Sequence, residues 1–446
     1  MKIFLKTYGC QMNKLDSELS IGSLVKEGYV FTEDVKDADI ILLNTCSVRE
    51  KAEHKVYSQL GSLRDPKKKN PELILGVLGC MAQNEGENIF KRMPHVNLIC
   101  GTRMFSKLPE LIEKINGTNK RILAIDEDGE VSFDRLVIQR QNKYNAFVSI
   151  MRGCDNYCSY CIVPYVRGRE FSRPVEDVIN EVKGLADDGC KEVMLLGQNV
   201  NSYGKGLGGD TTLATLLGKL DSIGGIERIR FVTSHPKDMT RDILEAVGEL
   251  PKVCENLHMP AQSGSDKILE KMRRQYTSAH YRGIVDMAKS LVPDITIASD
   301  FIVGFPGETE EDFEDTVSLM RDMRYQNCFI FKYSSRTGTA AAELKDNVPE
   351  KTKKKRNQIL LDLQSDISAE RNQDMIGKSV QVLVEGTSKT DENKLTGRTR
   401  QNQIVVFSLP KGESQAGEPS LIFGKFVNVY IEDSTDLTLY GRVCSC

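Results

Sequence analysis

Residues 153–161 read Gly-Cys-Asp-Asn-Tyr-Cys-Ser-Tyr-Cys, which places three cysteines in a C-x3-C-x2-C pattern. Cysteine thiolates hold iron–sulfur clusters, normally with four ligands for one 4Fe–4S cluster. Cys154, Cys158 and Cys161 have no fourth Cys or His within the usual short reach along the chain. Such a set would leave one iron open to bind another molecule. Zinc is the alternative metal, but a structural zinc site needs a fourth protein ligand.

The composition is that of a soluble globular protein. The 446 residues suggest two to four domains, with 40% hydrophobic and 28% charged residues. No apolar run approaches the roughly 18 residues of a membrane span, and residues 1–7 are too short and polar for a secretory signal. We therefore expect a cytoplasmic protein. Twelve cysteines in a reducing compartment favour metal sites over disulfides.

The charge balance gives no general affinity for nucleic acid, since 60 Lys and Arg stand against 63 Asp and Glu. Any RNA would have to meet a local basic patch. The two short basic runs, at residues 67–69 and 353–356, fit a solvated surface as well as a binding site.

The first 140 residues alternate apolar strand patterns with helical patterns. Helices are expected near 15–26 and 48–63. This alternation predicts a doubly wound parallel sheet. The expected strands are Lys2–Thr7, Asp39–Asn44, Leu73–Leu78 and Val96–Ile99.

Three cysteines follow the first three of these strands. Cys10, Cys46 and Cys80 are separated by 36 and 34 residues, each about one β–α unit. The carboxyl ends of parallel strands share one edge of a sheet, so these thiols should converge in space. The periodicity therefore predicts a second three-thiolate metal site. Cys100 ends the fourth strand, where a core cysteine is favoured and a fourth ligand is the alternative.

Six further strands alternate with helices after a polar connection at residues 126–143. This pattern predicts a partial (β/α)6 barrel, with its active site at the carboxyl ends of the strands. The C-x3-C-x2-C loop follows the first of them. Helices are expected at Val175–Asp187 and Glu311–Met323, and the strands at Ala146–Ile150, Glu192–Leu196, Ile229–Thr233, Asn256–Met259, Ile295–Val303 and Cys328–Tyr333.

The last part begins with a helical pattern at residues 349–375, and its character then changes. Five short strands are expected, and they predict a small β-barrel of the OB type. Residues 376–446 carry eight basic and eight acidic side chains, so RNA binding and a structural cap both remain open. The predicted domains are 1–140, 141–375 and 376–446, and the five strands are Ser379–Val384, Leu395–Thr399, Gln403–Phe407, Phe426–Ile431 and Leu437–Arg442.

Short motifs around the cysteines and at the strand ends complete the pattern. They are Thr-Tyr-Gly-Cys-Gln-Met-Asn at 7–13, Gly-Cys-Met-Ala-Gln at 79–83, Ile-Met-Arg-Gly-Cys at 150–154, Cys-Ile-Val-Pro-Tyr-Val-Arg-Gly at 161–168, Leu-Gly-Gln-Asn-Val-Asn at 196–201, Thr-Ser-His-Pro at 233–236, Gln-Ser-Gly-Ser at 262–265 and Asp-Phe-Ile-Val-Gly-Phe-Pro-Gly-Glu at 300–308. Together these motifs resemble the radical S-adenosylmethionine (SAM) superfamily, and nearly the whole chain resembles its methylthiotransferase family. That family joins a three-cysteine domain, a radical SAM barrel and a TRAM domain in this order.

The resemblance implies two 4Fe–4S clusters and S-adenosylmethionine as cofactors. Cys154, Cys158 and Cys161 would hold the cluster whose open iron binds the amino and carboxylate groups of SAM. One electron then cleaves SAM to a 5′-deoxyadenosyl radical, chemistry that the cofactor supplies. Cys10, Cys46 and Cys80 would hold a second cluster that carries the sulfur to be methylated and transferred. No other catalytic residue is expected.

The resemblance also implies a substrate and partners. The expected reaction replaces the hydrogen on carbon 2 of isopentenyladenosine, beside the anticodon of a tRNA, with a methylthio group. The motif around Cys10 favours this reaction over methylthiolation of threonylcarbamoyladenosine or of a ribosomal-protein aspartate. A flavodoxin- or ferredoxin-like electron donor and a sulfur source would be needed, and no membrane. A non-enzymatic iron–sulfur protein or a zinc module that binds RNA are the alternatives of another class.

Family position suggests the residues that contact SAM and RNA. Arg398 and Arg400 in the TRAM-like region would meet RNA phosphates. Arg167 and Arg173 would bind an anion or form surface salt bridges. His235 and His258 are expected to be satisfied core histidines, and the terminal Cys444 and Cys446 a tail with no metal. The expected SAM contacts are Gly197, Gln198, Asn199, Ser234, Gln262, Ser263, Gly304 and Gly307.

Overall fold

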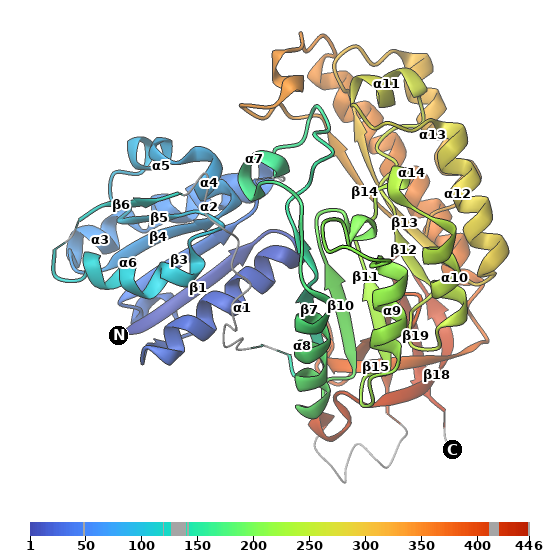
Figure 1. Cartoon of the computed structure of the whole chain (residues 1–446), viewed down its shortest axis with the longest axis horizontal. Coiled ribbons are helices and arrows are strands. Elements are labelled where there is room, and N and C mark those ends of the chain that lie inside the picture. Colours follow the sequence, from blue (N-terminus) through green and yellow to red (C-terminus); the bar gives the residue numbers. More distant parts are fainter. Residues whose placement is uncertain (48–49, 119, 126–139, 141, 410–418, 445–446) are drawn as a thin grey trace. The chain divides into compact units, whose positions relative to one another are not determined.

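The N-terminal region folds into one six-stranded parallel sheet with helices on both faces (Figure 1). This computed structural model describes residues 1–47, 50–118, 120–125, 140, 142–409 and 419–444. The sheet order is β2-β1-β3-β4-β5-β6, formed by β1 (Lys2–Tyr8), β2 (Val30–Phe31), β3 (Ile40–Thr45), β4 (Ile74–Gly79), β5 (Leu98–Cys100) and β6 (Ile122–Ala124).

Two apolar cores sandwich this sheet. α1 (Gln11–Lys26) and α6 (Leu108–Ile115) pack on one face, and α2 (Glu50–Ser62), α4 (Cys80–Glu85) and α5 (Glu87–Arg92) pack on the other. The strands β3 and β4 are buried along their whole length, as expected when both faces of a parallel sheet are covered. The predicted doubly wound sheet is therefore confirmed. The short strands β2 and β6 were not predicted, because two or three residues carry no periodic signal.

The central region contains six parallel strands in sequence order, surrounded by helices. Two three-stranded sheets, β7-β10-β11 and β12-β13-β14, are joined by an isolated bridge and by the hydrogen bond from the Ser234 amide to the His258 carbonyl. The strands are β7 (Asn145–Ser149), β10 (Glu192–Leu196), β11 (Arg228–Phe231), β12 (Asn256–His258), β13 (Thr296–Val303) and β14 (Asn327–Lys332). This arrangement is the predicted partial barrel.

Four of the described barrel helices, α9, α11, α12 and α13, begin after a Ser or Thr whose side chain caps the first turn. Thr309 precedes α13 and its hydroxyl accepts from the Asp312 amide, while the Asp312 carboxylate accepts from the Thr309 amide. This reciprocal capping satisfies two amides that the first turn leaves without partners. The helices are α8 (Val175–Asp187), α9 (Leu213–Asp221), α10 (Arg241–Glu249), α11 (Asp266–Lys271), α12 (Ser278–Leu291) and α13 (Glu310–Met323).

A closed five-stranded barrel forms the C-terminal part, coloured red in Figure 1. The helix α14 (Glu350–Gln373) precedes it. The strands occur in the order β15-β16-β17-β19-β18, which confirms the predicted small β-barrel. They are β15 (Ser379–Thr387), β16 (Leu395–Arg398), β17 (Ile404–Ser408), β18 (Phe426–Ser434) and β19 (Thr438–Val443).

The chain divides into two compact units. One comprises residues 1–141, 152–157 and 161–173, and the other comprises residues 142–151, 158–160 and 174–446. The first unit therefore includes α7 (Val163–Arg167), which follows the cysteine loop, and the second unit holds both the partial barrel and the β-barrel. The polar connection predicted at 126–143 lies largely outside the described residues.

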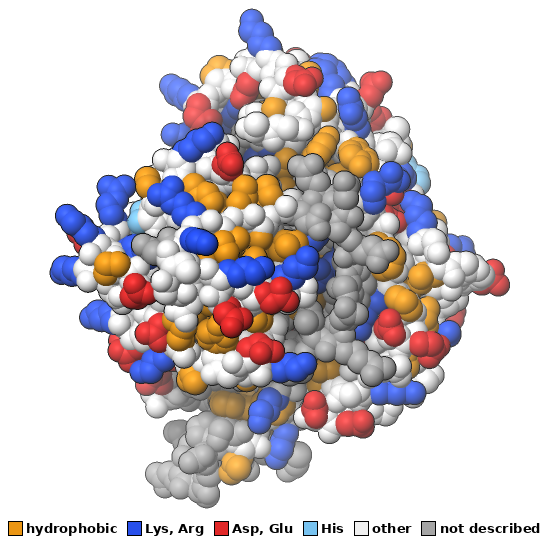
Figure 2. All heavy atoms as spheres, turned by 60° about the vertical axis from the view of Figure 1, so that its left-hand side comes forward, with side chains coloured by type: hydrophobic (Ala, Val, Ile, Leu, Met, Phe, Trp, Pro, Cys, Tyr) orange, Lys and Arg blue, Asp and Glu red, His pale blue; other side chains and the backbone are white. Residues whose placement is uncertain are grey.

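Charged side chains of both signs are interspersed with apolar ones on the face that Figure 2 presents. This mixture agrees with the balanced composition of the chain. Among the residues described, none of the helices combines the length and apolar composition that crossing a bilayer requires.

Candidate functional site

Cys10, Cys46 and Cys80 lie at one edge of the N-terminal sheet. Residues at the ends of the three strands are in register, with Tyr8 beside Thr45 and Thr45 beside Gly79. Cys10 caps the start of α1, Cys46 follows β3, and Cys80 is the first residue of α4. The three cysteines therefore lie at neighbouring strand ends. A hydrogen bond joins Cys10 to Cys46, and Cys80 is close enough for the charge of Cys10 to act on its thiol.

Buried asparagines set the backbone around these cysteines. The Asn13 carboxamide oxygen accepts from the amide and the thiol of Cys10, at 3.3 Å in both cases. Asn44, the residue before Thr45, donates to the Asn13 carbonyl and to the Ser17 hydroxyl at 2.9 Å. Asn13 and Asn44 are fully buried. These bonds attach α1 to the end of β3, and so hold Cys10 close to Cys46.

Gly79 must be glycine for this geometry. Its φ of +92° lies in the left-handed region, and a Cβ there would stand 2.3 Å from the Asn44 side-chain oxygen and 2.8 Å from the Thr45 carbonyl oxygen. A side chain at this position would push α4 and Cys80 away from β3.

A buried ion pair lies beside the thiols. Arg167, on α7, donates to the Asp16 carboxylate at 2.6 Å, and Arg152 stands 3.8 Å from the other Asp16 oxygen. The hydrogen bond from Cys46, together with the positive charge of Arg167, lowers the pKa of Cys10 to about 6, whereas burial raises the pKa of Cys80. The arginine predicted to bind an anion or to form a surface salt bridge is thus a buried cation next to the cysteines.

The three-cysteine edge carries the donor type that iron–sulfur clusters take. Among the described residues, no three His, Cys, Asp or Glu side chains are grouped as ligands of one metal ion. In a 4Fe–4S cluster each thiolate binds a different iron. Arg167 would offset the negative charge of three thiolates. The donor set and its surroundings therefore fit a cluster with three protein ligands.

Cys100 belongs to the hydrophobic core of the first unit. It is fully buried with Phe105, Leu108 and Ile112, and burial raises the pKa of its thiol to about 12. A neutral thiol in an apolar core is a poor metal ligand. This placement agrees with the preferred prediction for Cys100.

The loop with Cys154, Cys158 and Cys161 begins at another left-handed glycine. Gly153 has φ +76°, and a Cβ there would stand 1.9 Å from the Arg169 carbonyl oxygen. The Cys154 amide donates to the Gly168 carbonyl at 3.2 Å. The start of this loop therefore packs against the backbone of residues 168–169, which follow it in the chain.

Arg274 donates to the sulfur of Cys158 within the second unit. The distance from its Nη1 to Cys158 Sγ is 3.4 Å, and its other groups donate to the Pro260 carbonyl and to the Tyr276 hydroxyl. Arg274 is 5% exposed. Ser159 of the same loop donates through its hydroxyl and amide to the Lys271 and Met272 carbonyls. A cluster thiolate at Cys158 would thus receive a charged hydrogen bond.

The predicted SAM contacts on β10 and β11 lie at strand ends, as expected. Gly197 follows β10 and packs so closely on Met151 that a Cβ would stand 2.4 Å from its Cγ. Asn199 is buried and uses its side chain internally, donating to Asp238 at 2.7 Å. Ser234 is 2% exposed, and its hydroxyl has no hydrogen-bond partner among the described residues.

The remaining predicted SAM contacts adopt turn conformations. Gln262 has φ +68°, and Ser263 is 1% exposed and accepts from the Ser265 amide. Gly304 and Gly307 both have positive φ, and their amides donate to Glu308 and Asn347 at 2.7 Å. A Cβ at Gly304 would stand 2.3 Å from the Cγ of Lys353, whereas a Cβ at Gly307 would meet only the movable end of Lys271. The positive φ angles account for both glycines, and their contact with SAM stays a prediction.

The histidines at the strand ends differ from each other. His258 is paired through Nε2 with Asp300 at 3.3 Å, as a satisfied histidine should be. His235 accepts the Lys237 amide at Nδ1, but its buried Nε2 has no partner among the described residues. Burial, with Arg274 and Lys237 nearby, lowers the pKa of His235 to about 2.

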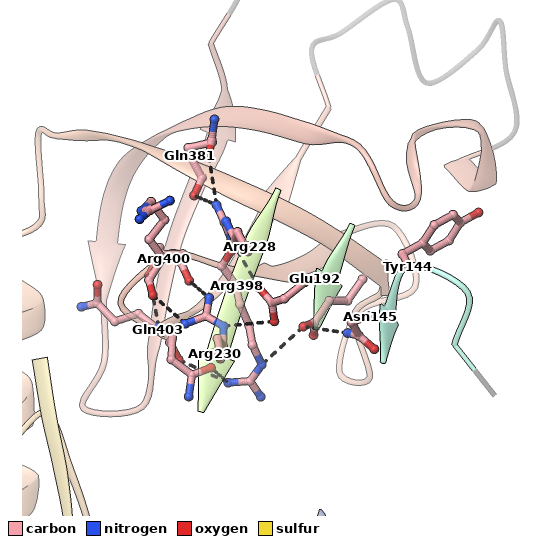
Figure 3. Close-up of polar contacts among 12 residues, drawn as sticks. Tyr144, Asn145, Glu192, Arg228, Arg230, Gln381, Arg398, Arg400 and Gln403 are labelled. Atoms are coloured by element: carbon pink, nitrogen blue, oxygen red, sulfur yellow. Dashed lines mark hydrogen bonds and ion pairs between the residues drawn. The ribbon is translucent and has the colours of Figure 1, made fainter. Parts of the chain in front are cut away.

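Arg398 and Arg400 lie where the β-barrel meets the start of the partial-barrel strands (Figure 3). The Arg400 guanidinium pairs with Glu255 at 2.6 Å and donates to the Pro251 and Val253 carbonyls. Arg398 donates to Asn402 and stands 3.4 Å from Glu385. Both predicted RNA contacts therefore already have protein partners.

Two arginines of β11 complete this interface within the second unit. Arg228 donates to the carbonyls of Arg398 and Gln381, and Arg230 donates to those of Arg400 and Thr399 at 2.6 Å (Figure 3). The Arg230 guanidinium also pairs with Glu192 at 3.0 Å. The segment with Arg398 and Arg400 is thus held by its backbone as well as by its side chains.

Asp16, Asn44 and Arg274 were missed in the sequence. Each is an ordinary residue of a helix, a strand or a loop, with no motif around it that signals its partner. Asp16 meets Arg167 from 151 residues away, and Arg274 meets Cys158 from 116 residues away. Only the fold brings them together.

Three family models match three separate parts of the chain. Residues 2–101 match the uncharacterized protein family UPF0004, residues 148–320 match the radical SAM superfamily, and residues 373–444 match the TRAM domain.

Relatives of similar length exist. A tRNA-2-methylthio-N(6)-dimethylallyladenosine synthase from Clostridium botulinum is 48% identical over 443 residues, covering 99% of this chain and 96% of the relative. A protein of the same name from Thermoanaerobacter pseudethanolicus is 47% identical, covering 98% and 92%.

Among solved structures, the radical SAM methyltransferase TsrM from Kitasatospora setae, with cobalamin and a [4Fe-4S] cluster bound, has a TM-score of 0.54. It is 12% identical, and the match covers 76% of this chain and 74% of that one. At this identity the likeness concerns the fold alone.

Proposed function

Because this chain belongs to the family of tRNA-2-methylthio-N(6)-dimethylallyladenosine synthases, which are radical SAM enzymes, we propose that it adds a methylthio group to N(6)-dimethylallyladenosine (isopentenyladenosine) in tRNA. The target atom would be carbon 2 of the adenine, beside the anticodon. The observation that carries the proposal is the 48% identity over 99% of the chain. The convergence of Cys10, Cys46 and Cys80 supports it, since a second three-thiolate site suits sulfur transfer.

The radical SAM site would be built on Cys154, Cys158 and Cys161. A 4Fe–4S cluster held there would supply the electron that reductive cleavage of SAM requires. Arg274 would donate to the Cys158 thiolate and keep it in one orientation. The predicted SAM contacts, from Gly197 to Gly307, lie at the carboxyl ends of the barrel strands or in the loops that follow them, where ligands of such barrels bind.

The second site would hold a further 4Fe–4S cluster that provides an open iron for the sulfur to be transferred. Cys10, Cys46 and Cys80 would be its ligands, and no fourth protein ligand is needed for this role. Arg167 would balance part of the charge of the three thiolates, and Asp16 would hold its guanidinium in place. Asn13 and Asn44 would keep the strand ends at the required spacing.

tRNA would meet the TRAM domain within residues 376–446. The target adenine must be unstacked to reach the barrel, which an anticodon loop allows more easily than a duplex. Arg398 and Arg400 remain our proposed phosphate contacts, and they would have to share or exchange their present partners. Arg400→Gln should then weaken tRNA binding and reduce the steepness of its salt dependence by about one phosphate contact. Loss of thermal stability with unchanged tRNA affinity would assign Arg400 to domain docking instead.

The experiment that tests the function uses anaerobically reconstituted full-length protein. It would be incubated with SAM, a reductant, sulfide and tRNA that carries dimethylallyladenosine without the methylthio group. Nucleosides from the digested tRNA would be analysed by mass spectrometry. A methylthio product that disappears in Cys10→Ala, Cys46→Ala and Cys80→Ala, while deoxyadenosine still forms, would support both the substrate and the second cluster.

Other outcomes distinguish the alternatives. Deoxyadenosine without a methylthio product in the wild-type protein would overturn the proposed substrate, and threonylcarbamoyladenosine tRNA and the ribosomal-protein aspartate would be tried next. No deoxyadenosine from a protein with intact clusters would favour a non-enzymatic role. A flavodoxin- or ferredoxin-like protein should be able to replace the chemical reductant. The same assay tests this by measuring the methylthio product formed with that protein as electron donor.

A further inference from the structure

His235 presents a buried hydrogen-bond donor that no described residue uses. The imidazole is 6% exposed, and its Nδ1 accepts the Lys237 amide at 3.2 Å. Because Nδ1 is an acceptor in this bond, the proton of the neutral ring is on Nε2. Nε2 has no partner among the described residues, and burying an unpaired N–H costs free energy. Such a group in a native fold calls for a partner.

The backbone holds this donor in a defined position. Asn199 and Asn201, from the turn after β10, both accept the His235 amide through their side-chain oxygens, at 3.2 and 2.9 Å. Asn201 also donates to the His235 carbonyl at 2.8 Å. Two residues earlier, Thr233 has φ +71°, a costly conformation for a β-branched residue. Strain of this kind occurs where a site needs a particular geometry.

The surroundings of His235 lead to Cys158 within the same unit. Its ring meets the Tyr276 ring edge to face, with centroids 5.6 Å apart. Arg274 donates to the Tyr276 hydroxyl at 3.0 Å and to Cys158 Sγ at 3.4 Å. His235 is therefore separated from a predicted cluster ligand by two side chains. It also lies just after β11, at the carboxyl end where ligands of such barrels bind.

We propose that His235 donates from Nε2 to an adenosine bound in the barrel. The acceptor would be a ring nitrogen or ribose oxygen. A neutral imidazole suits a neutral acceptor, whereas the nearby cation Arg274 already serves Cys158, Pro260 and Tyr276. The inference rests on the proposed function, in which adenosine is present twice, in SAM and in the target nucleotide. His235 is thus a binding residue, and not the satisfied core histidine that the sequence predicts.

Two substitutions distinguish the loss of the Nε2 donor from a disturbance of the turn that His235 caps. In His235→Asn the short carboxamide oxygen still accepts the Lys237 amide, as asparagine does at many helix starts, but no donor reaches the position of Nε2. In His235→Gln the longer carboxamide places an N–H near that position. His280→Asn, at an exposed position of α12, is the matched control. Thermal unfolding of each variant would establish that it is folded.

The test measures SAM affinity by equilibrium dialysis on the reconstituted full-length protein without tRNA. It then measures methylthio product per deoxyadenosine at saturating SAM. A five- to tenfold weaker SAM affinity in His235→Asn, with recovery in His235→Gln, would place the bond on the adenosine of SAM; the factor is roughly the net value of one hydrogen bond. Unchanged SAM affinity with a five- to tenfold lower product ratio would place it on the target adenosine.

Values within twofold of the wild type in both measurements would overturn the proposal. Equal losses in His235→Asn and His235→Gln would overturn it too, since the loss would then follow the turn and not the donor. If the wild-type protein makes no methylthio product, the proposed function fails separately. In that case the SAM affinity alone tests the role of His235, and an unchanged affinity in His235→Asn overturns the proposal.

Discussion

The two cysteine sites of this chain are built in opposite ways. Cys154, Cys158 and Cys161 lie within eight residues of one loop, so their proximity follows from the covalent chain. Cys10, Cys46 and Cys80 come from three β–α units and meet only because β1, β3 and β4 are in register. The first site is local and the second depends on the whole sheet. The second should therefore be the more sensitive to changes elsewhere in the fold.

The two sites also share features. Each has a left-handed glycine directly before a cysteine, Gly153 in the loop and Gly79 in the sheet. Each has a buried arginine that acts on a cysteine, Arg274 for Cys158 and Arg167 for Cys10 and Cys80. Two unrelated backbones thus reach the same chemistry, a group of thiols with a nearby positive charge.

The largest expected effect comes from removing each set of ligands. Replacing Cys10, Cys46 and Cys80 together with alanine should lower the iron content from about eight to about four atoms per chain, and so should replacing Cys154, Cys158 and Cys161. Iron and sulfide analysis of the anaerobically reconstituted proteins measures this. Unchanged iron in the first triple variant would mean that the sheet edge holds no cluster.

Breaking the buried ion pair should have the next largest effect. Arg167→Leu leaves the Asp16 carboxylate buried with only the more distant Arg152 nearby, and should lower the free energy of unfolding by about 3 kcal/mol. Urea denaturation of the reduced apoprotein gives the value. A loss below about 1 kcal/mol would show that Arg152 replaces Arg167 at Asp16.

Replacing either glycine should impair one cysteine site and spare the other, with a smaller loss of stability than Arg167→Leu. Gly79→Ala should destabilise the chain by about 1–2 kcal/mol through the positive φ alone, and should reduce iron binding at the sheet edge while the loop keeps its cluster. Gly153→Ala should do the reverse. Electron paramagnetic resonance with and without SAM tells the clusters apart, since SAM perturbs the one it binds. Equal loss of both clusters in either variant would contradict independent sites.

The smallest effect is expected at the surface of the loop. Arg169 is 79% exposed and pairs with Asp155 at 2.7 Å. Arg169→Gln should leave the free energy of unfolding nearly unchanged, and any difference should shrink in 1 M salt. This variant is the matched control for Arg167→Leu, because both remove an arginine near the cysteine loop. A similar loss in both would mean that burial is not what makes Arg167 important.

Much of the fold could be read from periodicity. The boundaries predicted for β10 and α8 coincide with those observed, because both segments have clear apolar patterns between polar turns. The short strands β2 and β6 were not predicted, because pairing with neighbouring strands and not local sequence preference makes them strands. Fewer of the side-chain contacts around the predicted functional residues could be foreseen. Arg400 fits an RNA contact in the sequence, yet its partner Glu255 lies 145 residues away.

The sequence by itself determined the cysteine loop, the strand–helix alternation and the 34- to 36-residue interval that places Cys10, Cys46 and Cys80 at one edge. These properties depend on neighbours along the chain or on regular repeats. Only the tertiary structure decided that Asp16 holds Arg167 and that the Nε2 of His235 has no partner among the residues the structure describes. Burial removes water from such groups, and whether a protein group replaces it depends on packing between segments distant in sequence.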